Sequence, residues 1–181
     1  MIVRLPQPEQ PGQSVLVALF QHNAWANLKL LDLCAGLSDE QLGATAVGTY
    51  GSIRATLLHL VRAEVRYVEH IDGKLPENPP LKDPFPSFDV LREAVRWAGD
   101  ELLQSALSAR ADTIVTQRQP NAIERYKLSD LMIQAVTHST EHRTQVSAIL
   151  TQLGLEPPDL SGWHWMEEKG EYQVTDLAAG E

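Results

Sequence analysis

Apolar residues recur at steps of three and four along residues 128–153, which is the period of one face of an α-helix. The stripe consists of Leu128, Leu131, Ala135, His138, His142, Val146, Ile149 and Leu153. Two of its members are therefore histidines at positions where core residues are expected. Side chains four residues apart lie one turn apart on the same side of a helix. Because buried imidazoles without partners are unfavourable, the pattern predicts a long helix whose two histidines share a ligand, and one metal ion suits both.

Three earlier segments carry the same helical period. Together with the last one, the predicted helices span residues 14–37, 52–71, 87–110 and 127–153. Ser52 and Ser87 are suited as N-caps, and Gly154 followed by two prolines ends the last helix. Four amphipathic helices of this length predict an all-α fold, an up-and-down four-helix bundle. We expect a single domain over residues 1–181, in which 1–13 form an extended arm and 159–181 a tail that packs back across the bundle.

Two connecting segments are unlike the helices. Residues 76–86 contain five prolines, which exclude a regular element and predict an extended surface crossing. Residues 113–116 have strand composition and Pro120-Asn121 is a turn signal, so a short hairpin is possible before the last helix.

Composition excludes several classes of protein. The single cysteine, Cys34, rules out an internal disulfide and a cysteine-based zinc site, and it fits a reducing compartment. No stretch approaches the ~20 apolar residues of a membrane span, and residues 1–13 do not have the features of a signal peptide. The formal net charge is −9 without a basic cluster, so we expect no nucleic-acid partner. A cytoplasmic protein without a membrane partner is the default.

A third histidine, His59, lies about eight residues into the second predicted helix, and His138 lies about eleven into the fourth. In an up-and-down bundle these helices run in the same direction, so the two depths differ by only ~4.5 Å. On a helical wheel, however, His59 shares its face with small residues and Arg66, and the large apolar residues point the other way. His59 is therefore either a surface histidine or a side chain facing an off-centre pocket that has room for a metal and a ligand.

Four stretches resemble one known family. Leu58-His59-Leu60-Val61-Arg62-Ala63-Glu64 resembles the second-helix signature of the DinB/YfiT-like metalloenzymes, and residues 138–145 are similar to the fourth-helix motif of that family. Residues 23–31 match its first helix and residues 153–159 a common ending. The resemblance covers nearly the whole chain, with the motifs in the right order.

The resemblance implies a four-helix bundle, often dimeric, whose metal ligands map onto His59, His138 and His142. It also implies a small-molecule substrate and a homodimer. We expect zinc or nickel, with iron or manganese as alternatives, because imidazole suits several divalent metals. Two positions depart from the family pattern: Glu141 replaces a frequent histidine, and Thr144 a small residue, often glycine.

Three imidazoles leave a coordination position open, which is typical of a catalytic site. A metal there can lower the pKa of bound water to ~7 or bind a thiol as thiolate. Some members of the resembled family are thiol S-transferases, which implies transfer of a low-molecular-weight thiol to a small electrophile. The alternatives are a metal-hydroxide hydrolase and a non-catalytic bundle with a structural metal.

Several side chains are candidates for roles around the metal. Glu141 is the candidate general acid or base, and a solvated surface glutamate is its alternative. The candidate pocket residues are Asn23, Asn27, Ser52, Thr56 and Ala63. Hydrogen bonds between helices explain the two asparagines equally well.

Other polar residues receive less specific predictions. Arg66 and Arg143 are candidates to bind an anionic substrate, although a solvent-facing position is expected for each. Arg62, Glu64 and Arg66 are expected in ordinary surface pairs. His22, His70, His164 and Cys34 are not expected in the site.

Overall fold

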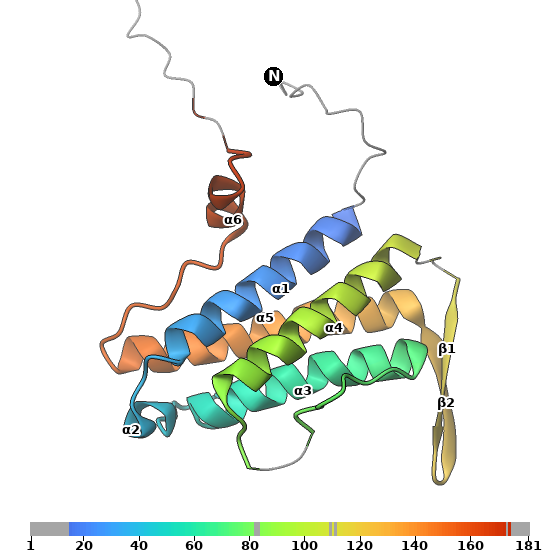
Figure 1. Cartoon of the computed structure of the whole chain (residues 1–181), viewed down its shortest axis with the longest axis horizontal. Coiled ribbons are helices and arrows are strands. Elements are labelled where there is room, and N and C mark those ends of the chain that lie inside the picture. The colour runs from blue at the N-terminus through green and yellow to red at the C-terminus, as the bar shows by residue number, and fades with distance from the viewer. Residues whose placement is uncertain (1–14, 82–83, 109, 111, 173, 175–181) are drawn as a thin grey trace, which may run out of the picture.

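The computed structural model describes residues 15–81, 84–108, 110, 112–172 and 174 (Figure 1). The predicted N-terminal arm, residues 1–13, lies outside these residues, as does most of the end of the tail. The described chain is mostly helical. Its long helices are α1 (Val15–Cys34), α3 (Ile53–Asp72), α4 (Phe88–Ser108) and α5 (Leu128–Gln152). Three of them lie inside predicted segments, and α3 extends one residue beyond its predicted end. The sequence did not predict the short helices α2 (Asp39–Leu42) and α6 (Gly162–Glu168).

The ends of α3 follow from local residues. Ser52 has extended backbone angles and its side chain accepts a hydrogen bond from the Ala55 N–H, as an N-cap does. At the other end, Gly73 adopts a φ of 69°, and its N–H donates to the Glu69 carbonyl. That left-handed conformation is open to glycine without the penalty that a Cβ would bring. The helix carrying His59 therefore begins and ends where its own sequence directs.

Each long helix packs against two others: α1 and α3 both contact α4 and α5 (Figure 1). Helices α1 and α4 approach closely where Gly99 meets Ala24, because a Cβ on Gly99 would lie 2.8 Å from the Ala24 Cβ. Where α1 ends and α4 begins, Arg92 Nε donates a hydrogen bond to Asp32 Oδ1 at 2.6 Å. The small residue at the crossing lets the two helices bury their apolar faces against each other.

The directions of the helices differ from the predicted up-and-down order. Lys74, just after α3, pairs with Glu101 in the second half of α4 at 2.6 Å, so α3 and α4 run in the same direction. His70, near the end of α3, contacts Tyr126, just before α5, at 3.1 Å, so α3 and α5 run in opposite directions. The prediction that the second and fourth long helices run the same way is therefore wrong. The length of the segment between α3 and α4 permits this arrangement, because a chain of about fifteen residues can reach further than the ~30 Å length of α3.

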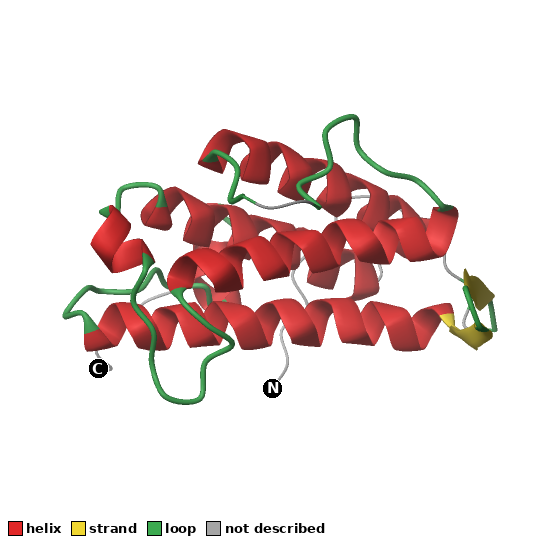
Figure 2. Cartoon of the chain, turned by 90° about the horizontal axis from the view of Figure 1, so that it is seen from below, coloured by secondary structure: helices red, strands yellow, loops and turns green. Residues whose placement is uncertain are grey.

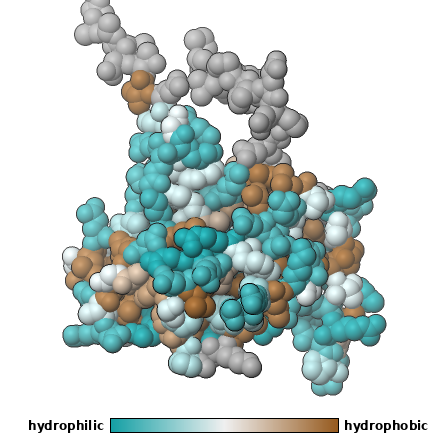
Figure 3. Space-filling view, in the orientation of Figure 1, coloured by the Kyte–Doolittle hydropathy of each residue, from teal (hydrophilic) through white to brown (hydrophobic). Residues whose placement is uncertain are grey.

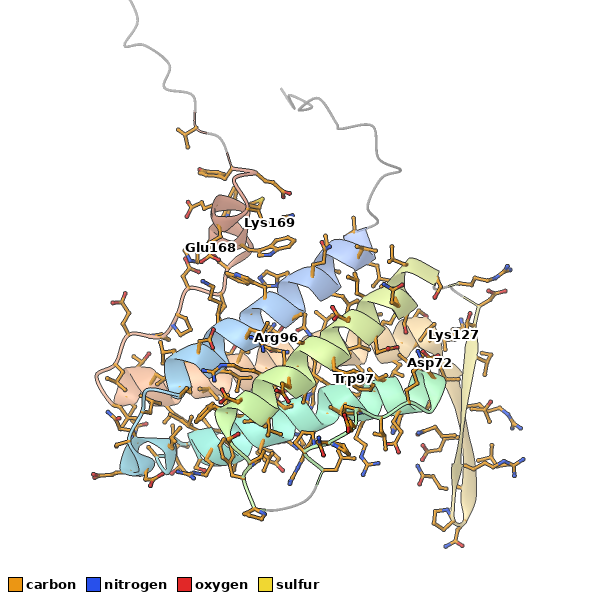
Figure 4. All side chains as sticks on the ribbon, viewed as in Figure 1. Asp72, Arg96, Trp97, Lys127, Glu168 and Lys169 are labelled. Carbon is orange, nitrogen blue, oxygen red and sulfur yellow. The ribbon has the colours of Figure 1, made fainter. Side chains whose placement is uncertain are left out.

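The predicted hairpin is present. Strands β1 (Ile114–Gln119) and β2 (Ala122–Lys127) pair antiparallel, with Gln119 opposite Ala122 around the predicted turn. Figure 2 shows the hairpin at one end of the long helices, and in Figure 4 Asp72 and Lys127 mark that same end. Val115 is buried against the helical core, which attaches the hairpin to it.

Helix α6 lies against α1. Glu168 accepts hydrogen bonds from Trp25 Nε1 at 3.0 Å and from Lys29 Nζ at 2.6 Å (Figure 4). His22 Nε2 lies 2.9 Å from the Leu160 carbonyl oxygen, on the chain leading into α6. The expected return of the tail therefore occurs, and it occurs on α1. Across the described residues, the length and apolarity needed to cross a membrane do not occur together in any helix.

Candidate metal centre

Three imidazoles converge between α3 and α5. The Nε2 atoms of His59 and His138 are 3.1 Å apart, and those of His142 and His138 are 3.2 Å apart. One nitrogen from each ring lies within 4.8 Å of the other two. We call His59, His138 and His142 the histidine cluster. The antiparallel course of α3 and α5 brings them to one level, and His59 faces its partners although its wheel position left a surface role open.

The side chain of Gln145 determines which nitrogen of His142 carries hydrogen. Gln145 Oε1 accepts the main-chain N–H of Tyr50 at 3.0 Å, which identifies this atom as the amide oxygen. The same oxygen lies 3.0 Å from His142 Nδ1. Because an amide oxygen only accepts, Nδ1 must be the donor. A neutral His142 therefore presents a lone pair on Nε2, toward the other two rings.

Hydrogen bonds alone do not satisfy the histidine cluster. His138 Nε2 faces both other Nε2 atoms, at 3.1 and 3.2 Å, and can carry at most one hydrogen. One divalent cation would satisfy three lone pairs at once. Two nitrogens held at 2.0–2.1 Å by a tetrahedral zinc ion lie roughly 3.3 Å apart, close to both of these spacings. The donor set therefore fits a metal ion.

Two members of the histidine cluster, His138 and His59, are held in the neutral form that metals require. Burial, together with the charges of His142 and His59, lowers the pKa of His138 to about 4. Burial also lowers the pKa of His59, followed by the charges of His142 and Arg62. Neutral imidazole is the ligand form, so these rings need not release protons near pH 7. Within the described residues, His138 Nδ1 has no hydrogen-bond partner.

Tyrosine rings and a cavity surround the histidine cluster. The ring of Tyr50 stacks on His59, with centroids 4.1 Å apart and planes 16° apart, and meets His142 edge-on at 5.4 Å. Tyr67 meets His138 edge-on at 5.9 Å. A cavity of ≈ 360 Å³ opens beside His59. A small ligand can therefore approach the imidazoles from the His59 side.

A second polar cluster lies deeper between the same helices. Glu64 Oε1, fully buried, accepts hydrogen bonds from Asn23 Nδ2 at 2.7 Å and Ser139 Oγ at 2.5 Å. Arg143 Nη1 donates to the Oδ1 atoms of Asn23 and Asn27 at 2.7 and 2.6 Å. We call these five residues the buried network. It joins α1, α3 and α5 through hydrogen bonds among its own members.

Burial shifts both charged members of the buried network toward their neutral forms. It raises the pKa of Glu64, against the hydrogen bonds from Ser139 and Asn23 and the charge of Arg143. It lowers the pKa of Arg143 to about 10, against the charge of Glu64. Each charge therefore stabilises the other where water is excluded.

The five predicted pocket residues do not lie together in the structure. Asn23 and Asn27 belong to the buried network, where they hydrogen-bond between helices. Ser52 lines the cavity beside His59. Thr56 is fully buried and Ala63 half-buried on α3. Only Ser52 of these five borders that cavity among the described residues.

For two of the following four charged residues, the structure overturns the prediction from the sequence. Arg143 is only 4% exposed and Glu64 0%, so the expected surface positions of these two residues are wrong. Arg66 is exposed and pairs with Glu69 at 2.5 Å, as a solvent-facing side chain does. Glu141 is exposed, and its Oε1 accepts from Gln145 Nε2 at 3.3 Å. It therefore reaches the histidine cluster through Gln145.

Gln145, Tyr50 and the pairing of Glu64 with Arg143 were not predicted from the sequence. A signal for the buried network was present, because Asn23/Asn27 and Ser139/Arg143 repeat the four-residue spacing of the two histidines. No comparable signal marks Tyr50, which acts from a loop.

The remaining histidines and the cysteine have other partners. His164 Nε2 lies 3.2 Å from Glu168 Oε1 within α6, and its ring lies 6.1 Å from Trp25. Cys34 is fully buried in the apolar core, and burial raises the pKa of its thiol to about 12. That cysteine is therefore an inert core residue.

Comparison with known proteins identifies the family of the chain. The family model described as "DinB family" matches residues 10–173, and the chain belongs to this family. The chain is also similar to "Protein DinB" of Bacillus subtilis (strain 168). These two proteins are 23% identical over 150 residues, which cover 75% of this chain and 84% of the relative.

Proposed function

We propose that the chain is a metal-dependent enzyme that activates a low-molecular-weight thiol for transfer to a small electrophile. The observation that carries this proposal is the convergence of three imidazole nitrogens within 4.8 Å, beside a cavity of ≈ 360 Å³. His59, His138 and His142 would hold the ion, with zinc or nickel expected and iron or manganese as alternatives. When bound, a divalent ion with an open position would stabilise a thiol as its thiolate.

The residues around the ion have separate tasks in this proposal. Gln145 keeps the Nδ1 hydrogen on His142, so its Nε2 lone pair points inward. Tyr50 shields His59 from bulk water by stacking on it. Excluding water strengthens electrostatic interactions inside the site and limits competing hydrolysis. A bound thiolate would thus be held beside the cavity that admits the electrophile.

Glu141 is the proposed proton acceptor for the incoming thiol. Its carboxylate is exposed and adjoins the site through Gln145 Nε2. Replacing Glu141 with Gln should lower turnover while metal content and melting temperature stay nearly unchanged. Glu40, exposed on α2, provides the control for loss of one surface carboxylate (Glu40→Gln). Equal turnover in parent and Glu141→Gln protein would remove Glu141 from the mechanism.

The larger assembly is also part of the proposal. We infer that the four long helices form a DinB-type four-helix bundle that acts as a cytoplasmic homodimer. An apolar patch supports the dimer: Val15 and Leu19, on the first turns of α1, are 78% and 44% exposed. Figure 3 shows this patch in brown at the upper edge of the molecule. Light scattering coupled to gel filtration would measure the oligomeric state.

Elemental analysis tests the metal directly. The parent protein, without an affinity tag, should contain near one divalent ion per chain. A variant with His59, His138 and His142 all replaced by Ala should contain none. The metal-loaded parent should then accelerate the reaction of small thiols with electrophiles, whereas the variant should not. A metal that raises the melting temperature without any thiol-dependent turnover would identify a structural site.

A further inference from the structure

The face of the hairpin that points away from the helical core is basic. Side chains alternate between the two faces of a strand, and Val115, which is buried, identifies the face that packs on the core. The residues of the opposite face are exposed: Ile114, Thr116 and Arg118 on β1, and Ile123, Arg125 and Lys127 on β2. Three cations therefore share this outer face with two isoleucines, which are 54% and 49% exposed.

The three cations of the outer face have no counter-charge. Within the described residues, no ion pair or side-chain hydrogen bond involves Arg118, Arg125 or Lys127. Among the other described arginines and lysines, only Arg96 on α4 is equally unpaired. Glu124, the one acidic residue of the two strands, belongs to the opposite face. In a chain of net charge −9, unpaired cations gathered on one face favour an acidic partner.

The main chain of β2 has an open edge beside these cations. Strand β2 pairs with β1 on one side, and no other described segment pairs with it. Because β1 lies against α3, β2 is the outer strand, and Figure 1 shows the turn of the hairpin directed away from the helices. An open edge can accept a further strand, and cations on that edge oppose pairing with a basic segment. Arg125 and Lys127, two positions apart, would lie beside alternate residues of an added strand.

We infer that β2 accepts an extended acidic peptide as a third strand of this sheet. Acidic side chains at alternate positions lie beside Arg125 and Lys127 in that arrangement, and an apolar side chain lies beside Ile123. The main chain of the peptide satisfies the open edge. A lipid surface suits the hairpin less well, because it cannot pair with the edge and because an extended anionic surface repels a chain of net charge −9.

This peptide site is separate from the histidine cluster. His70, whose ring contacts the Tyr126 hydroxyl of β2 at 3.1 Å, follows His59 on α3 by about eleven residues. At the rise of an α-helix that separation is ~16 Å. The inference therefore goes beyond the proposed function and does not rest on it, and it can be tested with or without bound metal.

Fluorescence anisotropy of a labelled peptide in which glutamate and valine alternate tests the site. The matched probe carries lysine in place of glutamate. The glutamate peptide should bind the parent protein at least about tenfold more tightly, because each charged pair attracts in one probe and repels in the other. The double variant Arg125→Gln with Lys127→Gln should lose that difference. Arg96→Gln, which removes an exposed and unpaired cation from α4, should keep it.

The double variant Arg125→Glu with Lys127→Glu guards against misfolding, because it should reverse the preference and bind the lysine peptide more tightly. Hydrogen exchange should slow at the amides of β2 when the glutamate peptide binds the parent. Binding without slower exchange in β2 would overturn strand addition, and equal affinity for the two peptides would overturn the acidic partner. Binding to vesicles that contain phosphatidylserine, without binding to the glutamate peptide, would identify a lipid surface instead.

Discussion

The histidine cluster and the buried network lie between the same two helices and differ by one residue position. On α5, His138 is followed by Ser139 and His142 by Arg143, and each following residue belongs to the buried network. Ser139 and Arg143 are 0% and 4% exposed, and they find hydrogen-bond partners within the protein. The Nε2 atoms of His138 and His142 instead face each other, 3.2 Å apart.

The two clusters show that polar residues inside a protein can either stabilise the fold or bind a ligand. The buried network pairs opposite charges and complementary donors and acceptors, so its members stabilise one arrangement of α1, α3 and α5. The histidine cluster gathers groups of one kind, which hydrogen bonds cannot satisfy among themselves. Convergence without internal pairing is therefore the physical mark of a ligand site, and satisfied pairing marks a structural one.

The largest effect should come from breaking the charge pair of the buried network. Arg143→Met leaves Glu64 buried without its cation, which should lower the free energy of unfolding by about 3–5 kcal/mol. Urea denaturation of the metal-free protein measures this. The control is Arg66→Met on the exposed face of α3, expected within about 0.5 kcal/mol of the parent.

The double variant Glu64→Leu with Arg143→Met sharpens the test. It leaves no unpaired charge, so it should recover part of the stability lost in Arg143→Met. Equal stability of Arg143→Met and the parent would show that the buried network does not stabilise the fold.

The second largest effect should be on metal affinity, through the tautomer of His142. Gln145→Leu removes the acceptor for His142 Nδ1, and metal affinity should fall by roughly 10–100-fold. Competition with a chromogenic chelator measures the affinity. Thr144→Val, at the exposed neighbouring position, should bind metal as the parent does. An unchanged affinity in Gln145→Leu would mean that His142 is oriented by packing alone.

A smaller effect should separate two adjacent residues of α5. Ser139→Ala removes the hydroxyl that donates to Glu64 at 2.5 Å, which should cost about 1–2 kcal/mol of unfolding free energy. Metal affinity should not change, because Ser139 belongs to the buried network. Thr137→Ala, exposed on the same helix, should change neither quantity. A lower metal affinity in Ser139→Ala would join the two clusters into one functional unit.

The smallest effect is a pH dependence of the metal-free protein. His138 has a pKa of about 4 when folded against an ordinary value of 6.5, so the unfolded chain binds more protons between these values. The free energy of unfolding should therefore fall as pH drops from 6.5 toward 4. The loss should be of order 1 kcal/mol, since solvent screens this half-buried site. His138→Asn should lose less stability over the same range in urea denaturation at each pH, and identical pH profiles would contradict the assignment.

Much of the local structure was predictable because it depends on residues close in sequence. The apolar period located all four long helices, Ser52 marked the start of α3, and Pro120-Asn121 marked the hairpin turn. The spacing of His138 and His142 placed both on one face of α5 without knowledge of any other helix. The family resemblance added His59, which periodicity alone left between a surface and a pocket position.

Only the tertiary structure decided how the helices face one another. A helix buries the same apolar stripe whether its neighbour runs parallel or antiparallel, so periodicity could not show that α3 opposes α5. Glu64 and Arg143 are each typical of a surface, and burial suits them only because their helices bring them together with Asn23 and Ser139. Gln145 likewise gains its role from Tyr50, a residue 95 positions away. The sequence by itself determined which residues share a helix face, and packing decided which faces meet.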